Sequence, residues 1–413
     1  MGIEKRNLRV LIVAPTPFFA DRGCHVRILE EAREIQSRGH NVLLCTYHHG
    51  RDIHGIQIKR SLHIPWYSKL SAGPSLHKLY VDPLLLATVV QAGFTFKPDI
   101  IHAHLHEGIV IGKLASAILR IPYVVDLQGS LTGELVQHHF MKEGGWVYHT
   151  ILRFESLMMK FPDGFMISST KRLPGLVSDE SSSGKPAIHI PDCVDINKFS
   201  PDIPREEKQR LKETLQIPDK CKVVGYLGVL TEYQGVAVLL HAVVDVVMSC
   251  PQTQFLIMGY PNVEYYEQLA KTLGIHSHLT FTGRLPYEKA SNYLAICDLA
   301  VSPKFHSTEA NGKLLNYMAM GLPVIASDTM VNREILGEYG VYVEVGNSKE
   351  LARAMIHNLE NVDAVGYGGR MLRKRAVEEY SWDVMADRMI ETYEKILDKP
   401  SISQKQGMTE KCI

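Results

Sequence analysis

The stretch between residues 298 and 326 constrains the fold of this chain most strongly. Residues 298–302 form an apolar run that reads as a buried strand, and Pro303 closes it. Farther on, apolar side chains recur at helical spacing, at Leu314, Leu315, Tyr317, Met318 and Met320. Gly321 and Pro323 stand where a helix should end. A second short apolar strand begins immediately afterwards, so the sequence predicts strand, polar loop, helix and strand.

The polar loop of this unit is the expected ligand site. In open α/β sheets, ligands bind at the carboxyl ends of parallel strands. A helix that begins at that edge favours a phosphate or another anion. The alternative is a plain buried strand–helix–strand unit whose polar loop is only solvated.

Residues 313–326, KLLNYMAMGLPVIA, resemble the nucleotide-sugar segment KLxEYMAxGxPVxA of the retaining GT-B glycosyltransferases of family 4. The resemblance implies an α/β chain of GT-B fold, with two doubly wound Rossmann-like domains that face a central cleft. It also implies a retaining glycosyltransferase that moves a sugar from a nucleotide-sugar donor to a carbohydrate, a lipid or another small acceptor. Asn316 departs from the pattern, because the family has at that position the Glu that holds the ribose hydroxyls.

Further motifs extend the resemblance over residues 8–398. The chain opens with a strand, a loop, a helix that carries Val26, Leu29, Ala32 and Ile35 on one face, and the RGH segment that closes the first family helix. Later motifs lie at residues 188–201 (the inter-domain turn), 279–286 and 380–383. The resemblance then implies an acceptor-binding domain at 1–198, a donor-binding domain at 199–380, and a helix at 381–398 that returns to the first domain. The polar residues 399–413 are predicted to be disordered.

The resemblance also implies roles for individual residues, although the sequence departs from the family at several. Val229 and Gln234 stand where the family has the Arg and Lys that hold the diphosphate, so Lys304 and Lys313 are expected to supply the positive charge. Gln128 replaces a family His; it can hydrogen-bond a sugar hydroxyl but cannot act as a general base. Donor contacts are expected from Gly23, Gly228, Gln234, Lys304, Ala310, Asn311, Gly312, Lys313, Leu314 and Asn316, catalytic contacts from Gln128 and Glu309, and acceptor-side contacts from His104 and Asp126.

Residues 98–107 are predicted to form a strand whose alternation places His102, His104 and His106 on one face. Such a row could bind a metal ion. The resemblance favours cleft-lining histidines instead, and no DxD metal motif stands in the cleft stretches. We therefore expect neither a metal nor another cofactor. For Asp126, a role at the acceptor and a purely local pairing both stay open.

Composition narrows the partners and the compartment. The 413-residue chain has a formal net charge of zero, which does not point to nucleic acid. Its seven cysteines are scattered and form no CxxC pair, as expected of free thiols in a reducing compartment. We expect a cytoplasmic protein without a signal peptide or a run of about 20 apolar residues.

Two further alternatives stay open. Residues 62–80 combine aromatic, basic and apolar side chains, which suits either peripheral contact with the inner membrane face or a loop and helix that cover the core. The departures at Gln128, Val229, Gln234 and Asn316 would also suit a non-catalytic nucleotide-sugar-binding or scaffold protein. An epimerase or phosphorylase on the same scaffold is the other alternative. The donor base, the acceptor and the oligomeric state do not follow from the sequence.

Overall fold

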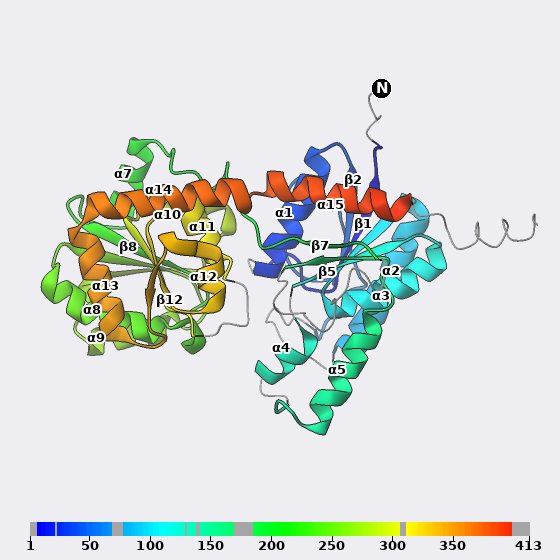
Figure 1. The fold of residues 1–413 in the computed structure, drawn as a ribbon, viewed down its shortest axis with the longest axis horizontal. Coiled ribbons are helices and arrows are strands. Elements are labelled where there is room, and N and C mark those ends of the chain that lie inside the picture. The colour runs from blue at the N-terminus through cyan, green and yellow to red at the C-terminus, as the bar shows by residue number, and fades with distance from the viewer. Residues whose placement is uncertain are drawn as a thin grey trace, which may run out of the picture. The chain divides into compact units, whose positions relative to one another are not determined.

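The computed structural model describes residues 6–20, 23–67, 77–128, 130–137, 141–168, 185–305 and 311–398. Glu309, Ala310 and the predicted tail at 399–413 lie outside these residues. The chain divides into two compact units, unit 1 (Met1–Pro191 with Trp382–Ile413) and unit 2 (Asp192–Ser381). Each unit has a parallel sheet with helices on both faces (Figure 1). The predicted α/β fold of two doubly wound units is confirmed.

Unit 1 contains a sheet with the strand order β3-β2-β1-β4-β5-β6-β7. The strands are β1 (Arg9–Ala14), β2 (Asn41–Thr46), β3 (Ile58–Arg60), β4 (Ile100–His104), β5 (Tyr123–Leu127), β6 (Gly164–Ile167) and β7 (Ala187–His189). The helices are α1 (Gly23–Ser37), α2 (Lys78–Phe96), α3 (Leu105–Leu119), α4 (Leu131–Gln137), α5 (Trp146–Met158) and α15 (Trp382–Leu397). The strand order reverses between β1 and β4, so the carboxyl ends of these strands mark the expected ligand edge.

Unit 2 repeats the plan with the order β10-β9-β8-β11-β12-β13. Its strands are β8 (Lys222–Leu227), β9 (Thr253–Met258), β10 (Leu279–Gly283), β11 (Leu299–Ser302), β12 (Val324–Ser327) and β13 (Val341–Val343). Its helices are α7 (Arg205–Thr214), α8 (Val236–Ser249), α9 (Val263–Thr272), α10 (Ala290–Leu294), α11 (Lys313–Ala319), α12 (Met330–Leu336), α13 (Ser348–Glu360) and α14 (Val362–Glu379). Here the order reverses between β8 and β11, so the loops after these two strands flank the switch point.

The central strands of unit 1 are made of nearly continuous runs of buried residues. The β1 residues from Val10 to Ala14 are all buried, as are all residues of β4 and β5. Strands covered by helices on both faces need such near-continuous apolar runs. The βαβ unit predicted at 298–326 is present as β11, α11 and β12. Its two strands, β11 and β12, pair in parallel.

The prediction that three histidines share one strand face is wrong for His106. Strand β4 ends at His104, and α3 begins at Leu105. The buried residues of α3 recur at helical spacing, at Gly108, Ile109, Ile111, Gly112 and Ala115. This longer period outweighs the short alternation of the histidines, so His106 lies in the first turn of α3.

Helix α2 bears on the expectation that the chain has no run of about 20 apolar residues. It is 19 residues long, and by length and composition it could cross a membrane. Val81, Leu85, Val89 and Ala92 are nevertheless fully buried and belong to the hydrophobic core of unit 1. This side of α2 therefore packs as the core helix of a globular unit does.

Candidate active site

The loops that follow β8 and β11 meet at the side chain of Lys313, the first residue of α11. The Lys313 Nζ atom donates a hydrogen bond to the Gln234 side-chain oxygen at 2.7 Å. It also lies 3.4 Å from the Tyr226 hydroxyl and 4.4 Å from the centre of the Tyr226 ring. Two segments far apart in sequence, β8 with its following loop and the start of α11, thus place a lysine, a glutamine and a tyrosine together at the switch point of unit 2.

Two glycines allow this close approach. Gly228 has a φ of +149°, and a Cβ atom there would stand 2.6 Å from Lys313 Nζ. Gly235 has a φ of +74°, and its Cβ would stand 2.0 Å from the carbonyl oxygen of Pro303. A side chain at Gly228 would therefore occupy the space beside the ammonium, and one at Gly235 would separate the two loops.

The electrostatics of this cluster favour an anion. Burial, with the neighbouring Lys304 charge, lowers the pKa of Lys313 well below its ordinary value. Lys313 forms no salt bridge with any residue that the structure describes. Lys304 is itself buried in the loop after β11. Two lysines with no carboxylate on Lys313 are the arrangement that a bound phosphate would stabilise.

The remaining predicted donor residues on this segment differ in what they offer. Asn311 is buried, and its side-chain amide donates to Ser302 and to Asn332, at 3.0 and 2.9 Å. Leu314 has its side chain in the core and its N–H bonded to the Asn311 carbonyl. The structure therefore uses these two residues to shape the loop and the start of α11.

Gly312 and Asn316 are the accessible members of the segment. Gly312 is exposed, and Asn316 is half-buried. Asn316 lies three residues after Lys313, on the same face of α11. Its side chain makes no hydrogen bond to a described residue. Lys313 and Asn316 thus present a cation and a carboxamide side by side.

Tyr317 fixes α11 against the end of β8. The Leu227 N–H donates to the Tyr317 hydroxyl at 2.7 Å, and the Tyr317 ring is fully buried. The hydroxyl therefore receives a backbone donor that the sheet would otherwise leave unpaired. This bond ties α11, whose first residue is Lys313, to the end of β8.

Comparison with known proteins identifies the family. Residues 22–171 match the family described as "Glycosyl transferase 4-like domain", and residues 221–361 match "Glycosyl transferases group 1". The chain belongs to the group 1 glycosyl transferases. The predicted family, the enzyme class and the use of a nucleotide-sugar donor are thereby confirmed.

Relatives of this glycosyltransferase match it over nearly its whole length. It is 26% identical to a phosphatidyl-myo-inositol mannosyltransferase of Mycobacterium tuberculosis over 94% of this chain and 97% of the relative. It is 24% identical to the sulfoquinovosyl transferase SQD2 of Arabidopsis thaliana over 92% of this chain and 72% of the relative. Its fold matches Anabaena Alr3699/HepE, solved in complex with UDP and glucose, with a TM-score of 0.74, 20% identity, and coverage of 94% of this chain and 100% of that one.

In unit 1 of the glycosyltransferase, Gln128 follows β5 and lies in front of a buried carboxylate. Its side-chain amide donates to Asp126 at 3.2 Å. Asp126 is fully buried and accepts two hydrogen bonds from Arg27, each of 2.8 Å. His104, also fully buried, lies 3.3 Å from the same carboxylate. Asp126 and His104 are therefore placed to orient Gln128, while Gln128 is the partly exposed member of the group.

Neighbouring charges and hydrogen bonds outweigh burial in setting the protonation of Asp126. Burial by itself would raise the pKa of this carboxyl, but the Arg27 guanidinium and His104 lower it below its usual range. Arg27 also donates to the carbonyls of Ile190 and Pro191, so its guanidinium is held from several sides. No local sequence pattern predicts this pairing, because Arg27 lies 99 residues from Asp126.

Glu155 of α5 anchors the segment that follows Gln128. Its carboxylate accepts hydrogen bonds from the N–H groups of Leu131 and Thr132 and from the hydroxyls of Ser130 and Thr132. His106 lies 3.3 Å away. Burial would raise the pKa of Glu155, but the bonds from His106 and Thr132 lower it to about 2. The ionised carboxylate thus ties the start of α4 to α5.

His25 supports the loop that follows β1, near the predicted donor residue Gly23. Its ring nitrogens bond the Thr16 hydroxyl at 2.5 Å and the Ala20 N–H at 2.9 Å. Gly23 begins α1, and a Cβ there would meet nothing within 4 Å. A buried histidine therefore holds the loop in this chain, and Gly23 stays a predicted donor contact.

A cluster of histidine and tyrosine rings, which the sequence analysis missed, follows the carboxyl ends of β2 and β3. The His48 ring lies 5.1 Å from that of His63, and the His49 ring lies 5.0 Å from that of Tyr67. His77 lies 5.1 Å from Tyr67. Apart from Tyr67, these side chains are partly or fully exposed. The only feature of the sequence that could have indicated this cluster is the excess of histidine in the first half of the chain.

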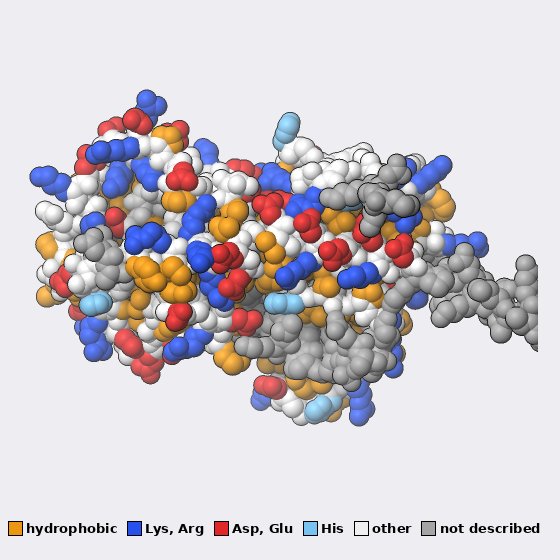
Figure 2. All heavy atoms as spheres, turned by 45° about the horizontal axis from the view of Figure 1, so that its top comes forward, with side chains coloured by type: hydrophobic (Ala, Val, Ile, Leu, Met, Phe, Trp, Pro, Cys, Tyr) orange, Lys and Arg blue, Asp and Glu red, His pale blue; other side chains and the backbone are white. Residues whose placement is uncertain are grey.

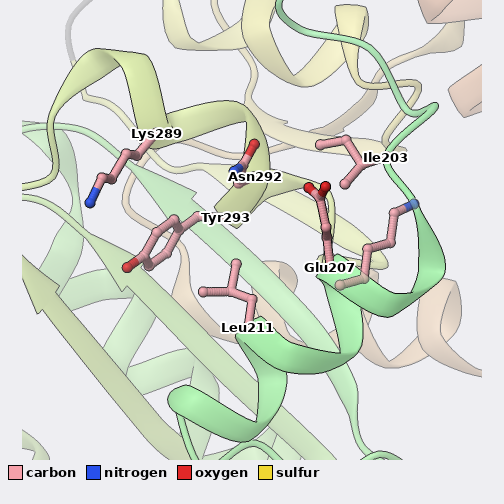
Figure 3. Close-up of a pocket in the computed structure, with 7 residues that line it drawn as sticks. Ile203, Glu207, Leu211, Lys289, Asn292 and Tyr293 are labelled. Atoms are coloured by element: carbon pink, nitrogen blue, oxygen red, sulfur yellow. The ribbon is translucent and has the colours of Figure 1, made fainter.

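The surface pocket of unit 2 lies apart from the predicted donor site. A pocket of about 240 Å³ in unit 2 lies between α7 and α10, where Ile203, Glu207, Leu211, Asn292 and Tyr293 line it (Figure 3). None of the predicted site residues contributes to it.

The charged side chains of the surface do not gather by sign. Figure 2 shows Lys and Arg interspersed with Asp and Glu over the visible face, consistent with the zero net charge.

Proposed function

We propose that this glycosyltransferase transfers a sugar, with retention of its anomeric configuration, from a nucleoside diphosphate sugar to a hydroxyl of a lipid headgroup. Unit 2 binds the donor, and unit 1 binds the acceptor. The observation that carries the proposal is the Lys313 ammonium, held by Gln234 at 2.7 Å beside the open backbone of Gly228.

The diphosphate of the donor is the ligand that this cluster would stabilise best. Lys313 supplies a charge-assisted hydrogen bond to a phosphate oxygen, and Lys304 adds a second positive charge nearby. The family has cations where this chain has Val229 and Gln234. Lys313 and Lys304 therefore have to carry the diphosphate charge here. Asn316, on the same face of α11, is the candidate for the ribose hydroxyls.

The chemistry needs positioning and charge stabilisation more than a protein base. The bond between the anomeric carbon and the donor phosphate breaks, and the acceptor oxygen bonds to that carbon on the same face. The departing phosphate takes the acceptor proton. Lys313 stabilises the negative charge that develops on the leaving diphosphate. Gln128 can hydrogen-bond a sugar hydroxyl, and Asp126 keeps its carboxamide oriented.

Two observations on unit 1 support a lipid acceptor. Val110, Leu114 and Ile118 form an exposed apolar stripe along α3, at intervals of four residues. Trp146, Phe154 and Leu157 of α5 are also exposed. So are Leu62 and Trp66, in the segment for which the sequence allowed either membrane contact or a cover over the core. Apolar side chains of this number on a surface suit peripheral contact with a lipid layer.

The ring cluster at the carboxyl edge of unit 1 suits a polyol headgroup. The faces of the partly exposed His48 and His49 rings offer apolar surface to a sugar or cyclitol ring, and the imidazoles offer hydrogen bonds to hydroxyls or a phosphate. The named relatives include a phosphatidyl-myo-inositol mannosyltransferase and a sulfoquinovosyl transferase. The first name agrees with an acceptor of this chemical class, whereas the second states only the sugar that is transferred.

The test begins with a calorimetric or thermal-shift screen of UDP-, GDP- and ADP-sugars. The donor that binds is then incubated with the enzyme and vesicles that contain phosphatidylinositol or diacylglycerol. We expect one glycolipid product, whose anomeric proton in NMR shows the configuration of the donor. An inverted product would refute retention. Transfer to free sugars but not to vesicles would refute the lipid acceptor and leave the donor site intact.

A further inference from the structure

Glu31, His102 and His104 form a cluster in the interior of unit 1. Glu31 lies on α1, and the two histidines lie two residues apart on β4, so that their side chains share one face of the strand. All three are fully buried. One ligand atom from each lies within 4.8 Å of the others.

The histidine nitrogens in the cluster lack hydrogen-bond partners. The Nε2 atoms of His102 and His104 make no hydrogen bond to any residue that the structure describes. Each lies 3.7 Å from the same oxygen of Glu31, which is too long for a hydrogen bond. A buried polar atom without a partner is costly and uncommon. Two such atoms that converge on one carboxylate oxygen point to a ligand between them.

The spacing fits a metal ion. Zinc–nitrogen and zinc–oxygen bonds of about 2.0–2.2 Å place tetrahedral ligand atoms roughly 3.4 Å apart. The 3.7 Å separations are within a few tenths of an ångström of this value. We propose that His102, His104 and Glu31 bind one divalent transition-metal ion of the zinc class.

Neighbouring groups orient both histidines as metal ligands are usually oriented. The Nδ1 of His102 is 2.7 Å from the Tyr393 hydroxyl of α15, and the Nδ1 of His104 is 3.3 Å from Asp126. When Nδ1 carries the hydrogen, the Nε2 lone pair faces the centre of the cluster. Outer partners of this kind fix the tautomer of metal-bound histidine.

The charge balance favours a cation. Glu31 and Asp126 contribute two negative charges, and Arg27, paired with both, contributes one positive charge. With neutral histidines the buried group carries −1. A divalent ion reverses this to +1 and supplies the missing partners of both imidazoles. It would join α1 to β4 and, through Tyr393, to α15.

The proposed ion is structural. It lies behind Asp126 and Gln128, whereas the diphosphate site proposed above belongs to unit 2. Its presence is therefore independent of the donor-binding proposal. This proposal departs from the sequence-based expectation that the chain binds no metal ion. This site uses Glu31 from another element and leaves out His106.

Metal content and cobalt spectroscopy test the site in the full-length chain. The protein is stripped with a chelator in mild denaturant, refolded, and titrated with Zn²⁺ or Co²⁺. We expect one ion per chain, visible cobalt bands typical of four or five ligands that include nitrogen, and a melting temperature about 5 °C or more above that of the stripped protein. An unchanged melting temperature with no cobalt bands would overturn the proposal.

Variants locate the ion. His104→Gln should lose cobalt binding, whereas His106→Gln, the matched control on the neighbouring helix, should retain it. If a variant does not fold, the wild-type cobalt spectrum still decides whether the ion is bound. Cobalt bands that persist in a folded His104→Gln protein would show an adventitious surface site and overturn the assignment.

Discussion

The Lys313 ammonium lies 2.7 Å from the side-chain oxygen of Gln234, in the position where relatives of this family are expected to have a second cation. The glutamine removes one positive charge but holds the remaining one beside Gly228. The site therefore has fewer cations than the family pattern, but the Lys313 ammonium that remains is held in place by a hydrogen bond. The predictions below follow from this pairing and from the buried network of unit 1.

Nucleotide affinity should depend on pH through Lys313. Burial and Lys304 lower the pKa of Lys313 in the free enzyme, and a bound diphosphate should raise it again. Binding therefore takes up protons, and affinity falls as the pH rises through the pKa of the free enzyme. Calorimetry in two buffers of different ionisation enthalpy should reveal the uptake. Lys313→Arg should remove it, because arginine stays charged; proton uptake that persists in this variant would assign it to another group.

Asn316 should contribute to donor binding without a full charge. A carboxamide can bond two ribose hydroxyls, but without the charge assistance of a carboxylate. Asn316→Ala should weaken donor binding by about 1 kcal/mol, and Asn316→Glu should bind at least as well as the native enzyme. The dissociation constants of both variants give the answer. If neither constant changes, Asn316 is only a surface position of α11.

Glu155 should stabilise the fold above acidic pH. Its folded pKa of about 2 is below the ordinary value of 4.5, so the stabilisation is present above about pH 4.5 and is lost as the pH falls toward 2. Glu155→Gln should lower the free energy of unfolding at pH 7 by roughly 2–3 kcal/mol. Denaturant unfolding between pH 7 and pH 3 should show the difference shrinking as the pH falls. A constant difference would mean that the loss comes from packing and not from charge.

Arg27 should be far more important for stability than a neighbouring surface arginine. Arg27→Met leaves Asp126 and Glu31 buried without their cation, at a cost of about 3–5 kcal/mol. Arg33 pairs with Glu30 on the same helix but is about one-third exposed, so Arg33→Met should cost less than about 1 kcal/mol. Chemical denaturation compares the two. Similar small losses would show that the Asp126 carboxyl becomes protonated when Arg27 is absent.

The alternation and helical spacing of apolar residues were enough to predict the parts of the fold that local patterns determine. The βαβ unit around α11 could be predicted because each strand and helix carries its own period and its own stop signal. The error at His106 has the same origin, since a strand of five residues and the first turn of a helix both fit a short alternation.

The buried polar network could not be predicted, because its pairs join distant residues. Arg27 and Glu31 are spaced like a solvent-exposed ion pair on a helix, and nothing local shows that α1 turns this face inward. Likewise Lys313 and Gln234 are 79 residues apart, and only the switch point of the sheet brings them together. The sequence could name both residues as donor-site candidates, but not the bond between them.

Donor binding by Lys313→Ala tests the central claim most directly. Titration calorimetry with the cognate nucleotide sugar is run on the native enzyme, on Lys313→Ala, on Lys304→Ala, and on Lys349→Ala, which removes an exposed lysine paired with Asp245. Loss of a charge-assisted phosphate contact should weaken binding by about 1.5–3 kcal/mol in Lys313→Ala, less in Lys304→Ala, and not measurably in Lys349→Ala. Native affinity in a folded Lys313→Ala enzyme would contradict the account, because the diphosphate would then be held elsewhere.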